Sequence, residues 1–223
     1  MYAIEPALES YNRSYEVDKA SIEDANQITN IVNNAIKNAD FFRKQDCDRI
    51  SLDEVESIIN ESSNRTWYVL KERIEEECVG AEKKIAAVVL YRAKERNKAS
   101  LHMFTLRVDL KGNGIGKILL KGVEELAVAE GKQEISLWCA NVPRLVRYYN
   151  NVGFIAAGRE LYYDSTYLRE EYIDAIKIVK LVKNLTPINS AAGNYPPLAI
   201  ACASDENNDL ELTAAVLNTC YFY

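Results

Sequence analysis

Three glycines within five residues constrain the fold of this chain most strongly. Gly112, Gly114 and Gly116 separate an apolar segment, 100–108, from a segment whose apolar residues recur at helical spacing. The pattern predicts a strand that turns sharply into a helix, because glycine adopts backbone conformations that other residues avoid. Such a turn presents backbone N–H groups at a helix start, where a phosphate binds well. The glycines alone are equally consistent with a turn that binds no ligand.

The common nucleotide-binding templates do not fit this turn. The third glycine of the dinucleotide fingerprint GxGxxG would fall at position 117, which is a lysine. A P-loop would require glycine in place of Lys111 and serine or threonine in place of Ile118. Lys111, Lys117 and Lys121 nevertheless surround the turn with positive charge, which suits a pyrophosphate.

The remainder of the chain predicts a mixed α/β domain. Six further segments are rich in strand-forming residues, at 15–19, 66–70, 85–91, 134–140, 154–163 and 174–181. Helical spacing of apolar residues follows Ser21, Ser51, the glycine turn and Pro143. The predicted order is therefore β-α-α-β-β-β-α-β-α-β-β, which is typical of a mixed sheet flanked by helices.

Composition argues against several classes of function. The formal charge of −6 does not favour nucleic acid, whose binding requires clustered positive side chains. No apolar run is long enough to span a membrane, and "MYAIEPALES" does not resemble a secretory signal. The five cysteines lack CxxC spacing, which favours free thiols and no metal site: Cys47, Cys78, Cys139, Cys202 and Cys220. We therefore expect a cytoplasmic protein without nucleic-acid, membrane or metal partners.

Two motifs in the second half of the chain carry a family resemblance. They are "LRVDLKGNGIGKILL" around the glycines and "NVPRLVRYYNNVGF" at residues 141–154. The first resembles the acetyl-CoA-binding signature Q/R-x-x-G-x-G/A of the GCN5-related N-acetyltransferases (GNAT), with Lys111 at its head. The second resembles the later GNAT signature, an asparagine and a tyrosine-containing helix that ends in Gly-Phe. The predicted element order from Tyr15 to Lys183 is also similar to the GNAT fold.

The resemblance implies a GNAT-like splayed sheet with an acetyl-CoA site. The pantetheine arm of acetyl-CoA would pair with strand backbone at 104–108, and its pyrophosphate would lie on the amides of 111–117. Asn141 has the position of a residue that often contacts the pantetheine arm. The implied cofactor-binding residues are Phe104, Leu106, Val108, Lys111, Gly112, Asn113, Gly114, Ile115, Gly116, Lys117 and Asn141.

The resemblance further implies an acyltransferase that acetylates an amine directly. An alkylamine with a pKa of about 10.4 is largely protonated at pH 7, so a general base is useful. His102 is the candidate base, since imidazole accepts a proton near neutral pH. Strand alternation predicts that His102 shares a face with Phe104 and Leu106. The alternative interpretation is a core histidine bonded to backbone.

Tyr149 is the second candidate catalytic residue. It stands four residues before Gly153, where many GNAT enzymes have a tyrosine that protonates the departing thiolate of CoA. The alternative interpretation is an aromatic residue that only packs in the core. The two interpretations differ in whether the hydroxyl or the ring matters.

The acceptor site is predicted from the first two helices, their connector and the last strand pair. The candidate residues are Phe41, Phe42, Arg49 and Tyr162. Aromatic side chains suit an apolar amine, and Arg49 suits a carboxylate. Each of them is also consistent with a simple folding role. Small amines and protein amines both remain open as acceptors.

The chain is predicted to consist of an N-terminal arm at 1–14, a GNAT-like domain at 15–185 and an extension at 186–223. The extension contains "YPPLAIACASDENNDLELTAAVL", which faintly resembles one ankyrin repeat. It is otherwise expected to pack on the domain or on a second subunit, as a homodimer or tail-mediated contact. A non-catalytic acyl-CoA-binding interaction module is the alternative function.

Overall fold

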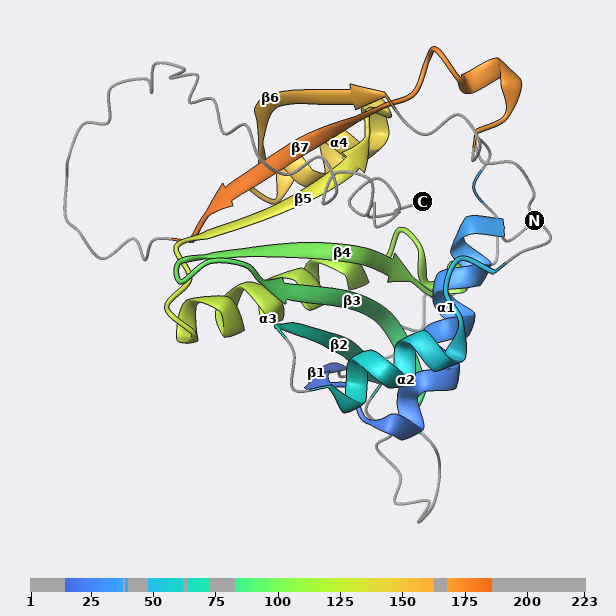
Figure 1. The fold of residues 1–223 in the computed structure, drawn as a ribbon, viewed down its shortest axis with the longest axis vertical. Helices are drawn as coiled ribbons and strands as arrows, with labels where there is room; N and C mark the ends of the chain where they lie inside the picture. Colours follow the sequence, from blue (N-terminus) through green and yellow to red (C-terminus); the bar gives the residue numbers. More distant parts are fainter. Residues whose placement is uncertain are drawn as a thin grey trace, which may run out of the picture.

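The computed structural model describes residues 15–37, 39, 48–61, 64–72, 83–162 and 168–185 (Figure 1). These contain a seven-stranded sheet in the order β1-β2-β3-β4-β5-β7-β6. The strands are β1 Tyr15–Lys19, β2 Arg65–Glu72, β3 Ile85–Ala93, β4 Lys98–Leu106, β5 Glu134–Ala140, β6 Ile155–Tyr162 and β7 Lys177–Asn184. The helices are α1 Ala25–Lys37, α2 Leu52–Asn60, α3 Ile115–Ala129 and α4 Pro143–Asn151. The predicted mixed α/β class and element order are confirmed.

The sheet divides where its two parallel strands meet. All other neighbouring strands pair antiparallel, but β4 and β5 run parallel. Their register extends only from Lys98 opposite Glu134 to Leu101 opposite Leu137. Beyond Leu101, the strand that pairs with β4 within the described ranges is β3, while β5 stays paired with β7 to its end. Figure 1 shows the two parts of the sheet spreading apart from this point. The splay implied by the resemblance is present.

Helices cover both faces of the sheet. On one face, α1 and α2 pack on each other and on β2, β3 and β4. The buried residues between them form a cluster, named the α1/α2 cluster, which includes Ile28 and Val55 of the helices and Leu90 of β3. On the other face, α3 packs against β1 to β4, and α4 packs against β5. The buried residues on this face form a second cluster, named the α3 cluster, which includes Leu119 and Val123 of α3. Amphipathic helices thus bury their apolar stripes on both faces.

The predicted final strand begins later than expected. Residues 170–172 form a short 3-10 helix and 173–175 a turn, so β7 starts at Lys177 and not at Asp174. No helix within the described ranges is long and apolar enough to cross a membrane. The predicted arm at 1–14 and the extension at 186–223 lie outside the described residues.

Candidate functional site

The glycine turn has the geometry that its sequence predicts. Gly112 and Gly114 have φ angles of 82° and 77°, in the left-handed region that favours glycine. A Cβ atom added at either glycine would meet nothing within 4 Å, so the backbone here is open to a ligand. Gly114 is the N-cap of α3, whose first helical residue is Ile115. The first N–H groups of a helix lack intrahelical partners and carry partial positive charge, so they suit an anion.

The strand that leads into this turn ends earlier than predicted. β4 ends at Leu106, and Val108 lies in a 3-10 helix, Val108–Leu110, named η2. Val108 therefore cannot offer extended strand backbone to a ligand, although Phe104 and Leu106 do lie in β4. The two glycines and Asn113 are exposed, whereas Ile115 and Gly116 are buried. The ligand-accessible part of the turn thus centres on 112–114.

Arg107 anchors the segment that follows β4. Its Nε and Nη2 donate to the two carboxylate oxygens of Asp109, at 2.8 and 3.1 Å. Nη2 also lies 2.9 Å from Oε1 of Glu72, and Nη1 donates to the carbonyl of Ile85. The bond to Asp109, followed by the charges of both acids, raises the pKa of Arg107. The guanidinium therefore ties η2 to β2 and β3, which the sequence motif did not reveal.

A bulge interrupts β4 within its splayed part. Two residues, Met103 and Phe104, stand opposite the single residue Val89, between the pairs His102–Leu90 and Thr105–Val88. Met103 has a φ of 46°, which is strained for a residue with a side chain. The extra residue reverses the alternation of faces beyond it.

This bulge contradicts the predicted orientation of His102. Its cross-strand partner Leu90 belongs to the α1/α2 cluster, so His102 points toward that face. Phe104 and Leu106 belong to the α3 cluster on the opposite face. The predicted shared face is therefore wrong, since simple alternation does not hold across a bulge. Met103, in the α1/α2 cluster, is the residue that shares the face of His102.

His102 is nearly buried, with 7% of its surface exposed. Its Nε2 lies 2.8 Å from Oγ of Ser100, which is also buried. The direction of this hydrogen bond depends on the histidine tautomer, because a neutral imidazole has one donor and one acceptor nitrogen. This arrangement is consistent with proton transfer by His102. It is equally consistent with a core histidine whose Nε2 is satisfied by the hydrogen bond.

Tyr149 is fully buried on α4, next to β5. Its ring makes edge-on contacts with Tyr148 and Phe154, at centroid distances of 5.2 and 5.8 Å. The backbone of Phe154 also donates to the carbonyl of Tyr149, at 3.0 Å. Burial, and then the charge of Glu124, raises the pKa of the neighbouring Tyr148. The Tyr149 ring therefore packs in the core, and the role of its hydroxyl stays a prediction.

The predicted acceptor residues do not form one described cluster. Phe41 and Phe42 lie outside the described residues. Arg49 is half-buried two residues before the N-cap of α2, and Tyr162 is 70% exposed at the end of the edge strand β6. Asn141 directly follows β5, and its N–H donates to the carbonyl of Lys177 at 2.7 Å. Asn141 thus lies beyond the last β4–β5 pair, as the cofactor prediction requires.

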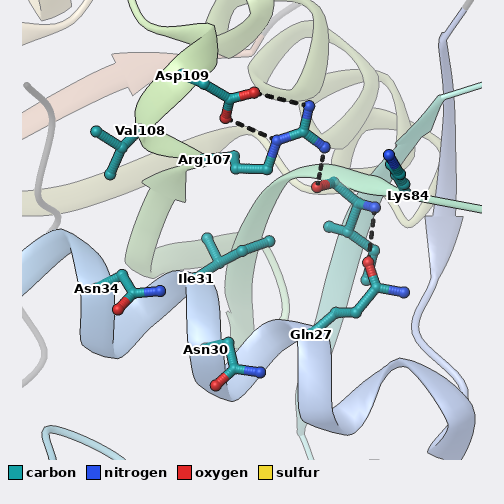
Figure 2. Close-up of a pocket in the computed structure, with 9 residues that line it drawn as sticks. Gln27, Asn30, Ile31, Asn34, Lys84, Arg107, Val108 and Asp109 are labelled. Atoms are coloured by element: carbon teal, nitrogen blue, oxygen red, sulfur yellow. Dashed lines mark hydrogen bonds and ion pairs between the residues drawn. The ribbon is translucent and has the colours of Figure 1, made fainter.

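A groove beside η2 was not anticipated from the sequence (Figure 2). It encloses about 690 Å³, and its lining comprises Gln27, Asn30, Ile31, Asn34, Lys84, Ile85, Arg107, Val108 and Asp109. Gln27 accepts from the Ile85 amide at 3.0 Å and donates to the Lys83 carbonyl at 3.3 Å. The carboxamide residues of α1 in this lining are Gln27, Asn30 and Asn34. Their spacing of three or four residues predicts that they share one face of the helix. They equip the groove with hydrogen-bond donors and acceptors.

Comparisons with known proteins agree with this architecture. A family model described as an acetyltransferase (GNAT) domain matches residues 47–166, which contain the glycine turn, His102 and Tyr149. No curated protein sequence matches the chain. Within the described ranges, no group of three His, Cys, Asp or Glu side chains is placed to hold a metal ion.

Several solved structures have a similar fold. An acetyltransferase of the GNAT family from Streptococcus pneumoniae is 20% identical, with a TM-score of 0.57 over 77% of this chain and 99% of its own. A spermidine N-acetyltransferase chimera from Vibrio cholerae and hSSAT is 14% identical, with a TM-score of 0.58 over 77% and 96%. A ribosomal-protein alanine N-acetyltransferase from Escherichia coli is 12% identical, with a TM-score of 0.55 over 81% and 100%. These similarities concern the fold.

Proposed function

Because the chain belongs to the GNAT acetyltransferase family, we propose that it transfers the acetyl group of acetyl-CoA to an amine, on a small molecule or on a protein. The observation that carries this proposal is the end of β4–β5 pairing at Leu101, on the strand that leads into the glycine turn. A thioester arm can enter such a splay, while its phosphates reach a helix start.

The residues present fit acetyl-CoA as the acetyl donor. The backbone of Phe104 to Leu106 lies on β4 beyond its last described pair with β5 and would hold the pantetheine arm. The amides of 111–116 would hold the pyrophosphate, where Gly112 and Gly114 leave the backbone accessible, whereas the Lys117 amide already donates to the Gly114 carbonyl at 2.9 Å. Asn141 would contact the arm from the end of β5. Acetyl-CoA itself supplies an activated thioester.

We assign the proton transfers to His102 and Tyr149. The neutral amine attacks the thioester carbonyl, the new C–N bond forms, and the C–S bond breaks. His102 accepts the proton that the attacking amine loses, on the α1/α2 face of β4 next to the bulge. Tyr149 donates a proton to the departing thiolate from α4, which packs on the β5 side of the splay. General acid–base groups each accelerate such a reaction by about 10²–10⁴-fold.

Two measurements test the proposal. Titration calorimetry with acetyl-CoA measures binding, and release of the free CoA thiol with a panel of amines measures turnover. We expect acetyl-CoA to bind and at least one class of amine to be acetylated. Binding without turnover on any amine would favour the non-catalytic acyl-CoA-binding module, and failure to bind any acyl-CoA would contradict both functions.

A further inference from the structure

Arg49 has a positively charged side chain that the described structure does not neutralise. Its Nη2 atom is buried and has no hydrogen-bond partner within the described ranges. The adjacent acid, Asp48, pairs instead with Lys37, with 3.0 Å between Oδ1 and Nζ. The other forked guanidinium near the site, Arg107, pairs with both Asp109 and Glu72. Arg49 therefore differs from Arg107 in lacking an acid for its inner nitrogen.

A half-buried guanidinium without an anion is costly to the fold. Removing a charged donor from water requires compensation by hydrogen bonds or an opposite charge. Arginine is always charged and offers a planar fork that matches a carboxylate in two parallel hydrogen bonds. The missing partner is therefore best described as a carboxylate that arrives with a ligand.

The backbone of Arg49 is held rigidly. The buried side chain of Asn33, 5% exposed, accepts from the N–H of Arg49 at 2.8 Å and of Ile50 at 3.1 Å. The same carboxamide donates to the Ile50 carbonyl at 3.0 Å. Both ends of one carboxamide thus anchor this short segment to α1. A preorganised arginine loses less entropy on binding than one on an unattached loop.

Arg49 adjoins the buried cluster that covers the face of β4 on which His102 lies. The next residue, Ile50, is buried in the same cluster as Met103, the strained bulge residue, and Leu90, the cross-strand partner of His102. Helix α1, to which the side chain of Asn33 ties Arg49, packs against both β4 and η2. A ligand anchored at Arg49 can therefore present another of its groups to the splay.

We propose that Arg49 binds a carboxylate of the acceptor, and that the acceptor is a small amino-carboxylate of the amino-acid type. This inference rests on the proposed function. The carboxylate is bound and does not react, while the amine of the same molecule attacks the thioester. Arg49 is thus a specificity-determining residue that selects amines carrying an acid.

Matched acceptors test this inference. The full chain is supplied with acetyl-CoA and a panel of amino acids, each paired with its carboxamide, which keeps the amine and side chain but removes the charge. For the best substrate, we expect kcat/KM for the acid to exceed that for its amide by about tenfold or more, the effect of one charge-assisted hydrogen bond. Equal kcat/KM values for acid and amide in every pair would overturn the proposal.

Substitution of Arg49 separates recognition from folding. We expect Arg49→Met to lower kcat/KM for the acid by about tenfold or more and to leave that for the amide unchanged. Its unfolding temperature without ligand should match or exceed that of the unsubstituted protein, because an unpaired cation is removed. Arg96→Met, at an exposed arginine before β4, is the control and should change neither value. Equal losses on acid and amide, or a clear drop in unfolding temperature, would show a structural role.

A binding measurement separates this inference from the proposed function. Calorimetric titration of the preferred acid and its amide, in place of the acetyl assay, reports recognition even where no acetyl transfer occurs. Acid binding that Arg49→Met abolishes supports the inference although the transferase activity fails. Turnover of amides and acids alike refutes the inference and leaves the transferase function standing.

Discussion

The two ends of β4 show how one strand serves both stability and chemistry. Its first half, up to Leu101, has a strand on each side and contributes buried residues to the core. Its second half, from His102, continues beside β3 past the last described β4–β5 pair, carries the strained bulge and leads into the glycine turn. The end of β4–β5 pairing thus places the second half of β4 at the splay. Substitutions in the first half should lower stability and leave acetyl-CoA affinity almost unchanged, whereas substitutions in the second half should lower activity and leave stability almost unchanged.

We expect the largest loss of activity at His102. His102→Gln keeps a side chain that can bond to Ser100 but cannot act as a base, so kcat should fall by about 100-fold or more. Acetyl-CoA affinity should stay unchanged. Steady-state kinetics and calorimetry check both expectations, with Ser100→Ala as a milder companion. An unchanged kcat would assign His102 to the core.

Tyr149→Phe tests the proposed proton donor on the β5 side of the splay. The ring contacts with Tyr148 and Phe154 remain, so unfolding temperature and acetyl-CoA affinity should hardly change. Loss of the proton donor should lower kcat by about 100-fold. Tyr148→Phe is the matched control and should retain activity. Equal kcat values for Tyr149→Phe and the unsubstituted protein would remove the general-acid assignment.

The glycine turn should respond through binding of acetyl-CoA. Gly114→Val places a branched side chain at a φ of 77° beside the proposed pyrophosphate site, where it shifts and covers the backbone amides, and we expect affinity to fall by roughly tenfold or more. Gly131→Val is closely matched, because its φ is 76° and its Cβ would also meet no atom within 4 Å. It lies beyond the other end of α3. Calorimetry should therefore show weaker binding only for Gly114→Val, and similar losses for both would indicate general destabilisation.

Arg107→Met should have a smaller effect on the same affinity. The change releases η2 from Glu72 and Asp109, so the turn must be ordered when acetyl-CoA binds. We expect affinity to fall by about threefold to tenfold, since the lost charge-assisted bonds act indirectly. Raised kcat/KM or unchanged affinity would show that the turn is rigid without this ion network.

Leu101→Ala should affect the site least and the fold most. Leu101 is buried in the α3 cluster at the last β4–β5 pair, so the free energy of unfolding should fall by about 2–5 kcal/mol. Acetyl-CoA affinity of the folded protein should remain close to that of the unsubstituted protein. Denaturant unfolding and calorimetry measure the two quantities. A large loss of affinity at little cost in stability would contradict the division of β4.

Local patterns explain what could be predicted. The glycine turn, the helix that follows it and the order of elements depend on residues adjacent in the chain, and all were predicted. The bulge at Met103 was missed because methionine has no preference for a positive φ. As a result, the predicted orientation of His102 was wrong although its strand was correct. The Arg107 fork was also missed, because Glu72 and Ile85 lie far from Arg107 in sequence.

The sequence by itself determined the element order, the glycine turn and the family resemblance, because periodicity and short motifs act over neighbouring residues. Only the tertiary structure decided where β4 leaves β5, which face His102 occupies and that Nη2 of Arg49 has no partner in the part of the chain that is described. These features depend on contacts between distant segments and on which buried charges find an opposite charge. Neither can be read from spacing along a single chain.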